Sequence, residues 1–137
     1  MARFRLIKRI AALVLLVSFF LPLYQCTFQG ESAGDPLLSY DISAFSAYSW
    51  PSVEITLAAF LFGWAAVLQM ISFRRPTFEA SRRTFALEVV LSLLAILGIS
   101  WLIHWTQTIR YGAFVAYAAI LAYLIAAIAG QARRAPP

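Results

Sequence analysis

Four long apolar runs constrain the fold of this chain more than any other feature of its sequence. They cover about residues 7–24, 51–73, 85–105 and 111–130. A helix needs roughly 20 apolar residues to cross the hydrocarbon core of a bilayer. A soluble domain of 137 residues that is 62% hydrophobic lacks the interior to hide so much apolar surface. We therefore predict a single-domain, all-α integral membrane protein, a four-helix bundle with up-down-up-down topology.

The connections between the predicted spans differ in length and charge. The outer loop, 25–50, is long and apolar for a loop, and it carries acidic but no basic side chains. Within it, Asp41 is placed to cap a short interfacial helix. The apolar face of that helix would consist of Ile42, Phe45 and Tyr48. The inner loop, 74–84, is rich in arginine, whereas 106–110 leaves room only for a tight turn between two antiparallel helices.

The basic residues indicate which side of the membrane each connection faces. Ten of the eleven lysines and arginines fall in the two terminal tails or the inner loop, and only Arg110 falls on the other side. Cytoplasmic segments carry the excess of basic residues, so both termini are predicted to lie in the cytoplasm. Lys8 and Arg9, in the short first run, are expected to extend to the lipid headgroups. The inner loop supplies four candidate contacts for anionic lipids: Arg74, Arg75, Arg82 and Arg83.

Polar side chains inside the spans are the candidate functional residues, because placing them in lipid is costly. Glu54 and His104 are predicted at one depth near the outer face, and Gln69 and Glu88 at one depth near the cytoplasm. The second and third spans would then share two polar contacts, which line a path for a proton or a solute. We expect Glu54 and His104 to lie within about 6 Å of each other, the range of direct charge pairing.

A simpler interpretation assigns these residues no function. Each glutamate occupies a first helical turn, where the helix dipole favours an acidic group. Glu88 would then pair locally with Arg82 or Arg83. His104, between two tryptophans, would belong to the interfacial aromatic belt.

The residue types that usually carry catalysis or bind metals are scarce. His104 is the only histidine and Cys26 the only cysteine, so neither a multi-histidine metal site nor a CxxC motif is available. His104, with Ser100 one turn away, is a candidate axial ligand for a haem or a chlorophyll-type pigment, although the main expectation is no cofactor. The sequence shows no nucleophile and base arranged for catalysis, which predicts a non-enzymatic protein. It also shows no motif for binding nucleic acid.

Small residues recur every four positions along the last span and predict close helix packing. This helix-packing stripe consists of Ala118, Ala122, Ala126 and Gly130. Such spacing lets helices approach closely in lipid, either within the bundle or against another subunit.

Taken together, these features predict a non-enzymatic accessory or structural subunit of a larger membrane protein complex, with lipids and other membrane subunits as partners. The alternative is a small oligomeric transporter or channel component that uses the intramembrane glutamates and histidine. A third interpretation is a haem- or pigment-binding membrane subunit. Arginine outnumbers lysine ten to one, which is typical of a GC-rich bacterial genome and therefore points to the cell inner membrane.

Overall fold

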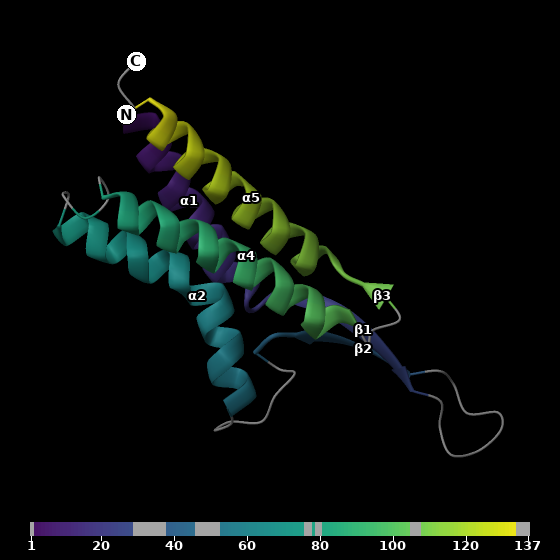
Figure 1. The fold of residues 1–137 in the computed structure, drawn as a ribbon. Helices are drawn as coiled ribbons and strands as arrows, with labels where there is room; N and C mark the ends of the chain where they lie inside the picture. The colour runs from purple at the N-terminus through teal and green to yellow at the C-terminus, as the bar shows by residue number, and fades with distance from the viewer. Residues whose placement is uncertain are drawn as a thin grey trace.

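Four helices form the body of the protein in the computed structural model, which describes residues 2–28, 38–45, 53–75, 78, 81–104 and 108–133 (Figure 1). They are α1 (Ala2–Ser18), α2 (Val53–Arg74), α4 (Arg82–His104) and α5 (Tyr111–Ala132). The prediction of four helices is therefore confirmed. Three of them, α2, α4 and α5, are long and apolar enough to cross a bilayer, which fits a membrane location.

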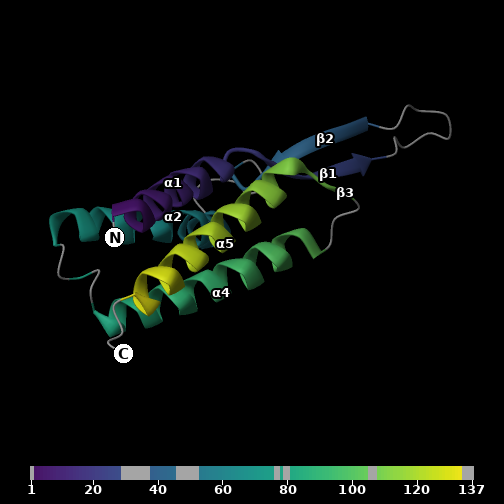
Figure 2. The ribbon, with the colours of Figure 1, turned by 90° about the horizontal axis from the view of Figure 1, so that it is seen from above.

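The helices pack in a ring, and neighbouring helices run in opposite directions. In this ring α1 contacts α5 and α2, and α4 contacts the same two helices. The start of α1 and the end of α5 lie at one end of the bundle, together with the end of α2 and the start of α4 (Figure 1). We call this the arginine end, because it carries the N-terminal basic residues, Arg74, Arg83 and Arg133. Viewed from above, α5 lies between α1 and α4 (Figure 2).

The first helix is shorter than the predicted first span. It ends at Ser18 rather than near residue 24. The amides of Phe19, Phe20 and Leu21 bond to carbonyls three residues earlier, which tightens the last turn. Pro22 follows, and it both lacks an amide hydrogen and disfavours helix in the residue before it. With 17 residues and four basic side chains, α1 is not among the candidate spans.

A small sheet lies at the opposite end, which the all-α prediction did not include. Its strands are β1 (Pro22–Phe28), β2 (Leu38–Ser43) and β3 (Thr108–Ile109). They are antiparallel in the order β2-β1-β3, so residues before α5 join a hairpin that follows α1. The prediction that Asp41 caps a helix is wrong, because Asp41 pairs with Gln25 inside β2.

The sheet is anchored closely against the start of α5. Gly112 lies there, and a Cβ atom at this position would be 2.5 Å from the carbonyl oxygen of Pro22. The amide of Arg110 donates to the carbonyl of Leu23 at 2.9 Å. Only glycine permits this approach of helix and strand.

Apolar side chains fill the interior and also cover the outside of the helices. The interior is built on small, branched and aromatic residues, among them Leu15, Phe62, Ile99 and Ile120, all buried. Large apolar residues are exposed on all four helices, for example Leu13, Met70, Leu97 and Ile125. Exposed apolar surface of this extent is unusual in a soluble monomer, and it agrees with the three candidate spans.

Candidate functional site

A buried polar network crosses the interior of the bundle, and each helix contributes one side chain. Lys8 comes from α1, Gln69 from α2, Glu88 from α4 and Tyr123 from α5. Each of the four is at most 8% exposed. Lysine and glutamate are almost never fully buried unless they are paired. We therefore treat this four-residue network as the candidate site.

Glu88 is the centre of the network. The Nζ of Lys8 donates to Oε1 of Glu88 at 2.5 Å, and the Tyr123 hydroxyl donates to the same oxygen at 2.9 Å. The Nε2 of Gln69 donates in turn to the Tyr123 hydroxyl at 2.9 Å. The ammonium of Lys8 also lies 5.3 Å from the centroid of the Tyr123 ring, within the range of a cation–π interaction. Tyr123 therefore connects the side-chain amide of Gln69 on α2 with the ion pair between α1 and α4.

The four side chains meet because their helices place them at similar depths from the arginine end. Lys8 lies six residues into α1 and Glu88 six residues into α4, which is about 9 Å along each axis. Gln69 lies five residues before the end of α2, and Tyr123 nine residues before the end of α5. Since α2 and α5 run toward the arginine end, all four positions fall in one layer of the bundle.

The network is stable only because its polar groups satisfy one another. An unpaired buried charge costs several kcal/mol, and a buried pair is tolerated when further hydrogen bonds complete it. Here Glu88 accepts from two donors, and Ser92 donates to its backbone carbonyl at 2.7 Å. Trp64 packs edge-on against the Tyr123 ring, with centroids 5.2 Å apart. These contacts hold the tyrosine where it can bridge α2 and α4.

A small cleft connects the network to the arginine end. Its volume is about 30 Å³, which accommodates one or two water molecules. Lys8 and Glu88 lie at its inner end. The other lining residues are Phe4, Arg5, Phe85, Ala126, Ala127, Gly130, Gln131 and Arg133. Toward the sheet, in contrast, the network is followed by an apolar layer that includes Leu15, Phe62 and Ile99.

Two predictions about the charged residues near the arginine end are wrong. Lys8 does not extend to the headgroups, because it is only 4% exposed and turns inward to Glu88. Glu88 is bonded to Lys8 and Tyr123 rather than to Arg82 or Arg83. The reason is geometric: Lys8 lies on the same helical face as Ala11, Ala12 and Leu15, the buried face of α1.

The predicted contacts between the second and third spans have different outcomes. Gln69 and Glu88 are brought together, but through the Tyr123 hydroxyl rather than directly. The side chain of Glu54 lies outside the described part of the structure, so its pairing with His104 stays a prediction.

His104, the candidate ligand for a haem or pigment, is exposed at the end of α4. One turn earlier, the Ser100 and Tyr117 hydroxyls are hydrogen-bonded at 2.7 Å, and the binding of a haem or pigment at His104 stays a prediction. Within the described residues, no group of three or more potential metal ligands is found.

The residues of the helix-packing stripe differ in burial and do not form one packed surface. Ala126 is buried in the bundle, whereas Ala118 is exposed and Ala122 is half-buried. A Cβ atom at Gly130 would meet nothing within 4 Å. Close packing of α5 inside the bundle uses Gly112, Ala113 and Ala116 instead.

The four arginines proposed as lipid contacts, Arg74, Arg75, Arg82 and Arg83, are all exposed.

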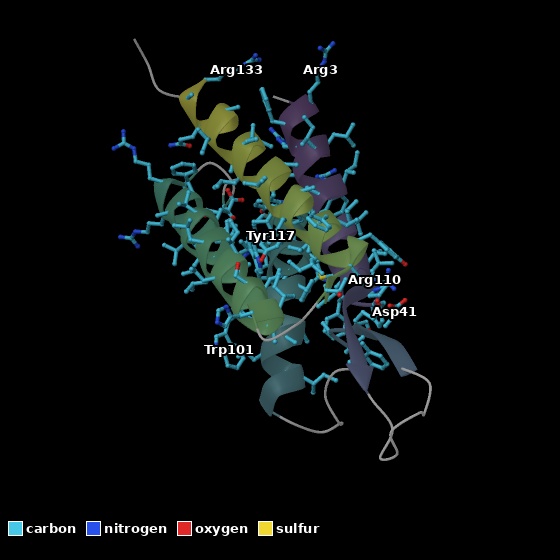
Figure 3. All side chains as sticks on the ribbon, turned by 90° about the vertical axis from the view of Figure 1, so that its right-hand side faces the viewer. Arg3, Asp41, Trp101, Arg110, Tyr117 and Arg133 are labelled. Carbon is cyan, nitrogen blue, oxygen red and sulfur yellow. The ribbon has the colours of Figure 1, made fainter. Side chains whose placement is uncertain are left out.

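A second polar contact lies at the sheet end. The Nε of Arg110 donates to Oδ1 of Asp41 at 3.0 Å, and Figure 3 shows the two side chains together, far from Arg3 and Arg133. The basic residue on the predicted outer side is thus neutralised by an acid on β2.

Comparison with known protein families, with curated proteins and with solved structures gives no match to this chain.

Proposed function

We propose that this chain is an integral membrane protein that acts as a non-enzymatic accessory or structural subunit of a larger membrane complex. The protein would lie in the inner membrane of a bacterial cell, with both termini in the cytoplasm. Support for the orientation comes from the charges, because the arginine end gathers the basic residues while Arg110 at the sheet end is paired with Asp41. Cytoplasmic segments carry such an excess of positive charge.

The observation that carries the proposal is an apolar groove between α1 and α5. It has a volume of about 360 Å³. Apolar side chains line it throughout: Ile7, Ile10, Ala11, Val14, Val115, Ala118, Ala119 and Ala122. The small side chains of α5 let another helix approach closely at this position. The side chains of the four-residue network, meanwhile, are engaged with one another.

Site-specific photo-crosslinking in cells tests this function. A photoreactive phenylalanine analogue at Ala118 should cross-link to one discrete membrane protein. The matched control is Leu97, which is 66% exposed on α4 and lies outside this groove. Cross-links of equal yield at both positions, or to lipid alone at Ala118, would contradict the proposal.

A transporter or channel component is the second candidate, and the cleft that reaches Lys8 and Glu88 favours it. An ionisable pair open to water on one side is a feature of proton pathways. The apolar layer between the network and the sheet counts against a path through a single copy. If the protein is an accessory subunit, liposomes that contain it should show no proton uptake. Proton uptake that is abolished by Glu88→Gln would support the second candidate.

A visible absorbance spectrum of the purified protein tests the third candidate, haem or pigment bound at His104.

A further inference from the structure

We propose that a groove between α2 and α4 binds the headgroup of a membrane-dissolved quinone. The inference rests on the proposed membrane location and adds a small-molecule site to it. In the ring of helices, the pair α2 and α4 lies opposite the pair α1 and α5. This groove is therefore separate from the surface proposed to contact a partner subunit.

The groove has the size and the apolar character of a small-molecule site. Its volume is about 320 Å³, at the lower end of the range of ligand pockets. Leu91 lines it from α4, and the side chains of α2 that line it include Phe60 and Val67, which are 53% and 58% exposed. A Cβ atom at Gly63, also in the lining, would meet nothing within 4 Å. The glycine thus leaves space beside these side chains, and the groove opens toward the surface that we place in lipid.

Trp64 supplies a hydrogen-bond donor to this apolar lining. Of the described residues that line the groove, only Trp64 carries a polar side-chain group. It is 3% exposed, and its indole N–H donates to no acceptor among the described residues. The neighbouring Tyr123 hydroxyl is already bonded to Gln69 and Glu88. A buried donor without an acceptor is costly and rare in folded proteins, and a ligand that brings an acceptor would relieve that cost.

The depth of Trp64 selects the chemical class of the ligand. Trp64 lies ten residues before Arg74, the end of α2, which is about 15 Å along the helix axis. Since the hydrocarbon core is about 30 Å thick, this position is near its centre. The ester carbonyls of phospholipids stay beside the headgroups, and a charged ligand is excluded by the cost of entering hydrocarbon. A quinone is uncharged, dissolves in the core and carries ring carbonyls that accept hydrogen bonds, and its flat ring can pack against Phe60 and Trp64.

Indole NMR of the protein in detergent micelles tests the site directly. The chain has four tryptophans, and the resonance that Trp64→Phe removes from the isotope-labelled protein belongs to Trp64. Addition of a short-tailed benzoquinone should move this N–H resonance downfield, because the proton enters a hydrogen bond. Decylbenzene, an apolar molecule of similar size without carbonyls, should leave it in place.

Variants of the groove separate the hydrogen bond from the space. Trp64→Phe keeps an aromatic ring and should bind the radiolabelled benzoquinone about fivefold more weakly, which corresponds to one neutral hydrogen bond. Trp101→Phe, at a residue that is 62% exposed and lies outside the groove, should bind it as the parent does. Gly63→Leu fills the groove and should abolish binding, whereas Gly130→Leu, also at a glycine with open space around it, should retain it. Each variant should unfold at the temperature of the parent, and the NMR titration of the parent chain decides where one does not.

Several outcomes would overturn the inference. A Trp64 resonance that stays in place at saturating benzoquinone would mean that the indole N–H meets no carbonyl. An equal response to decylbenzene would assign the groove to acyl chains. A photoreactive phenylalanine analogue at Val67 that cross-links to a membrane protein in cells would assign it to a partner helix. A protein that remains in solution without detergent would refute the membrane location itself, whereas a failed titration of a detergent-dependent protein would refute the quinone site alone.

Discussion

At the scale of single residues, the charges of Lys8 and Glu88 lie in an interior that is otherwise almost wholly apolar. Neither is tolerated alone, since each would be a charge removed from water without a partner. Tyr123 completes the pair by donating to Glu88 and accepting from Gln69. The structure therefore joins all four helices through one carboxylate oxygen and one hydroxyl.

Removal of Lys8 alone should destabilise the protein strongly. Lys8→Met leaves Glu88 buried without its counter-ion, and the free energy of unfolding should fall by about 3–5 kcal/mol. The double variant Lys8→Met/Glu88→Met removes both charges and should recover most of that loss. Thermal or SDS-induced unfolding in detergent measures the effect, with exposed Arg3→Met as a control expected to lie within about 0.5 kcal/mol of the parent. A double variant as unstable as the single one would contradict the pairing.

The Tyr123 hydroxyl should matter even though its ring is already well packed. Tyr123→Phe keeps the edge-on contact with Trp64 but leaves the Gln69 amide without its acceptor. Unfolding should become easier by about 1–3 kcal/mol, as followed by thermal denaturation. Tyr111→Phe, at a residue that is 58% exposed, is the matched control. If both variants unfold at the same temperature, the hydroxyl bridge contributes nothing.

At the scale of elements, the approach of α5 to β1 sets the most demanding local requirement. Gly112 faces the backbone of Pro22 at a distance that excludes a side chain, and a backbone oxygen cannot turn away as a side chain can. The junction thereby fixes the sheet to the helical bundle.

Two glycines of the same helix should respond oppositely to alanine. Gly112→Ala forces α5 away from β1 and should lower the free energy of unfolding by about 1–3 kcal/mol, as overpacking does. Gly130→Ala meets open space and should be neutral or stabilise by up to about 1 kcal/mol, because alanine favours helix. Circular dichroism during heating compares the two. Similar destabilisation by both would show that Gly130 packs closely, as the helix-packing stripe predicted.

The helices could be predicted from sequence because α2, α4 and α5 are long apolar runs and α1 is a shorter apolar run that follows a cluster of basic residues. The sheet could not, for two physical reasons. Residues 22–24 are compatible with a strand as much as with a helix, and only Pro22 indicates that the helix ends before them. The pairing of Tyr24 with Ile109 joins residues far apart in the chain. In the candidate site, Gln69 and Glu88 stand out as polar residues in apolar runs, whereas Lys8 resembles a headgroup contact and Tyr123 a packing residue.

At the scale of the whole molecule, the two ends of the bundle differ in charge and architecture. One end gathers exposed arginines at the start of α1 and the end of α5, and the other carries the sheet with its Arg110–Asp41 pair. The exposed surface between them is apolar. The difference in charge between the two ends supports the proposed orientation in the membrane, which labelling can test.

Single-cysteine labelling should place the two ends on opposite sides of the membrane. In a Cys26→Ser background, Arg83→Cys should react with an impermeant maleimide only when the cytoplasmic face is accessible. Ile109→Cys, at a strand residue that is 45% exposed, should react from the outside of intact cells. Val90→Cys, which is 52% exposed on α4, lies within a candidate span and should stay unlabelled. Labelling of both end positions from the same side would contradict the topology.

The contact between Lys8 and Glu88 joins residues 80 positions apart in the chain, and this separation has a consequence during synthesis. A ribosome adds about 5–20 residues per second, so the lysine is made several seconds before the glutamate exists. Over that interval the ammonium must remain in water or among headgroups, because no counter-ion is yet present. α1 leaves the ribosome before α4, and Lys8 can therefore reach its final buried position only after α4 has been translated.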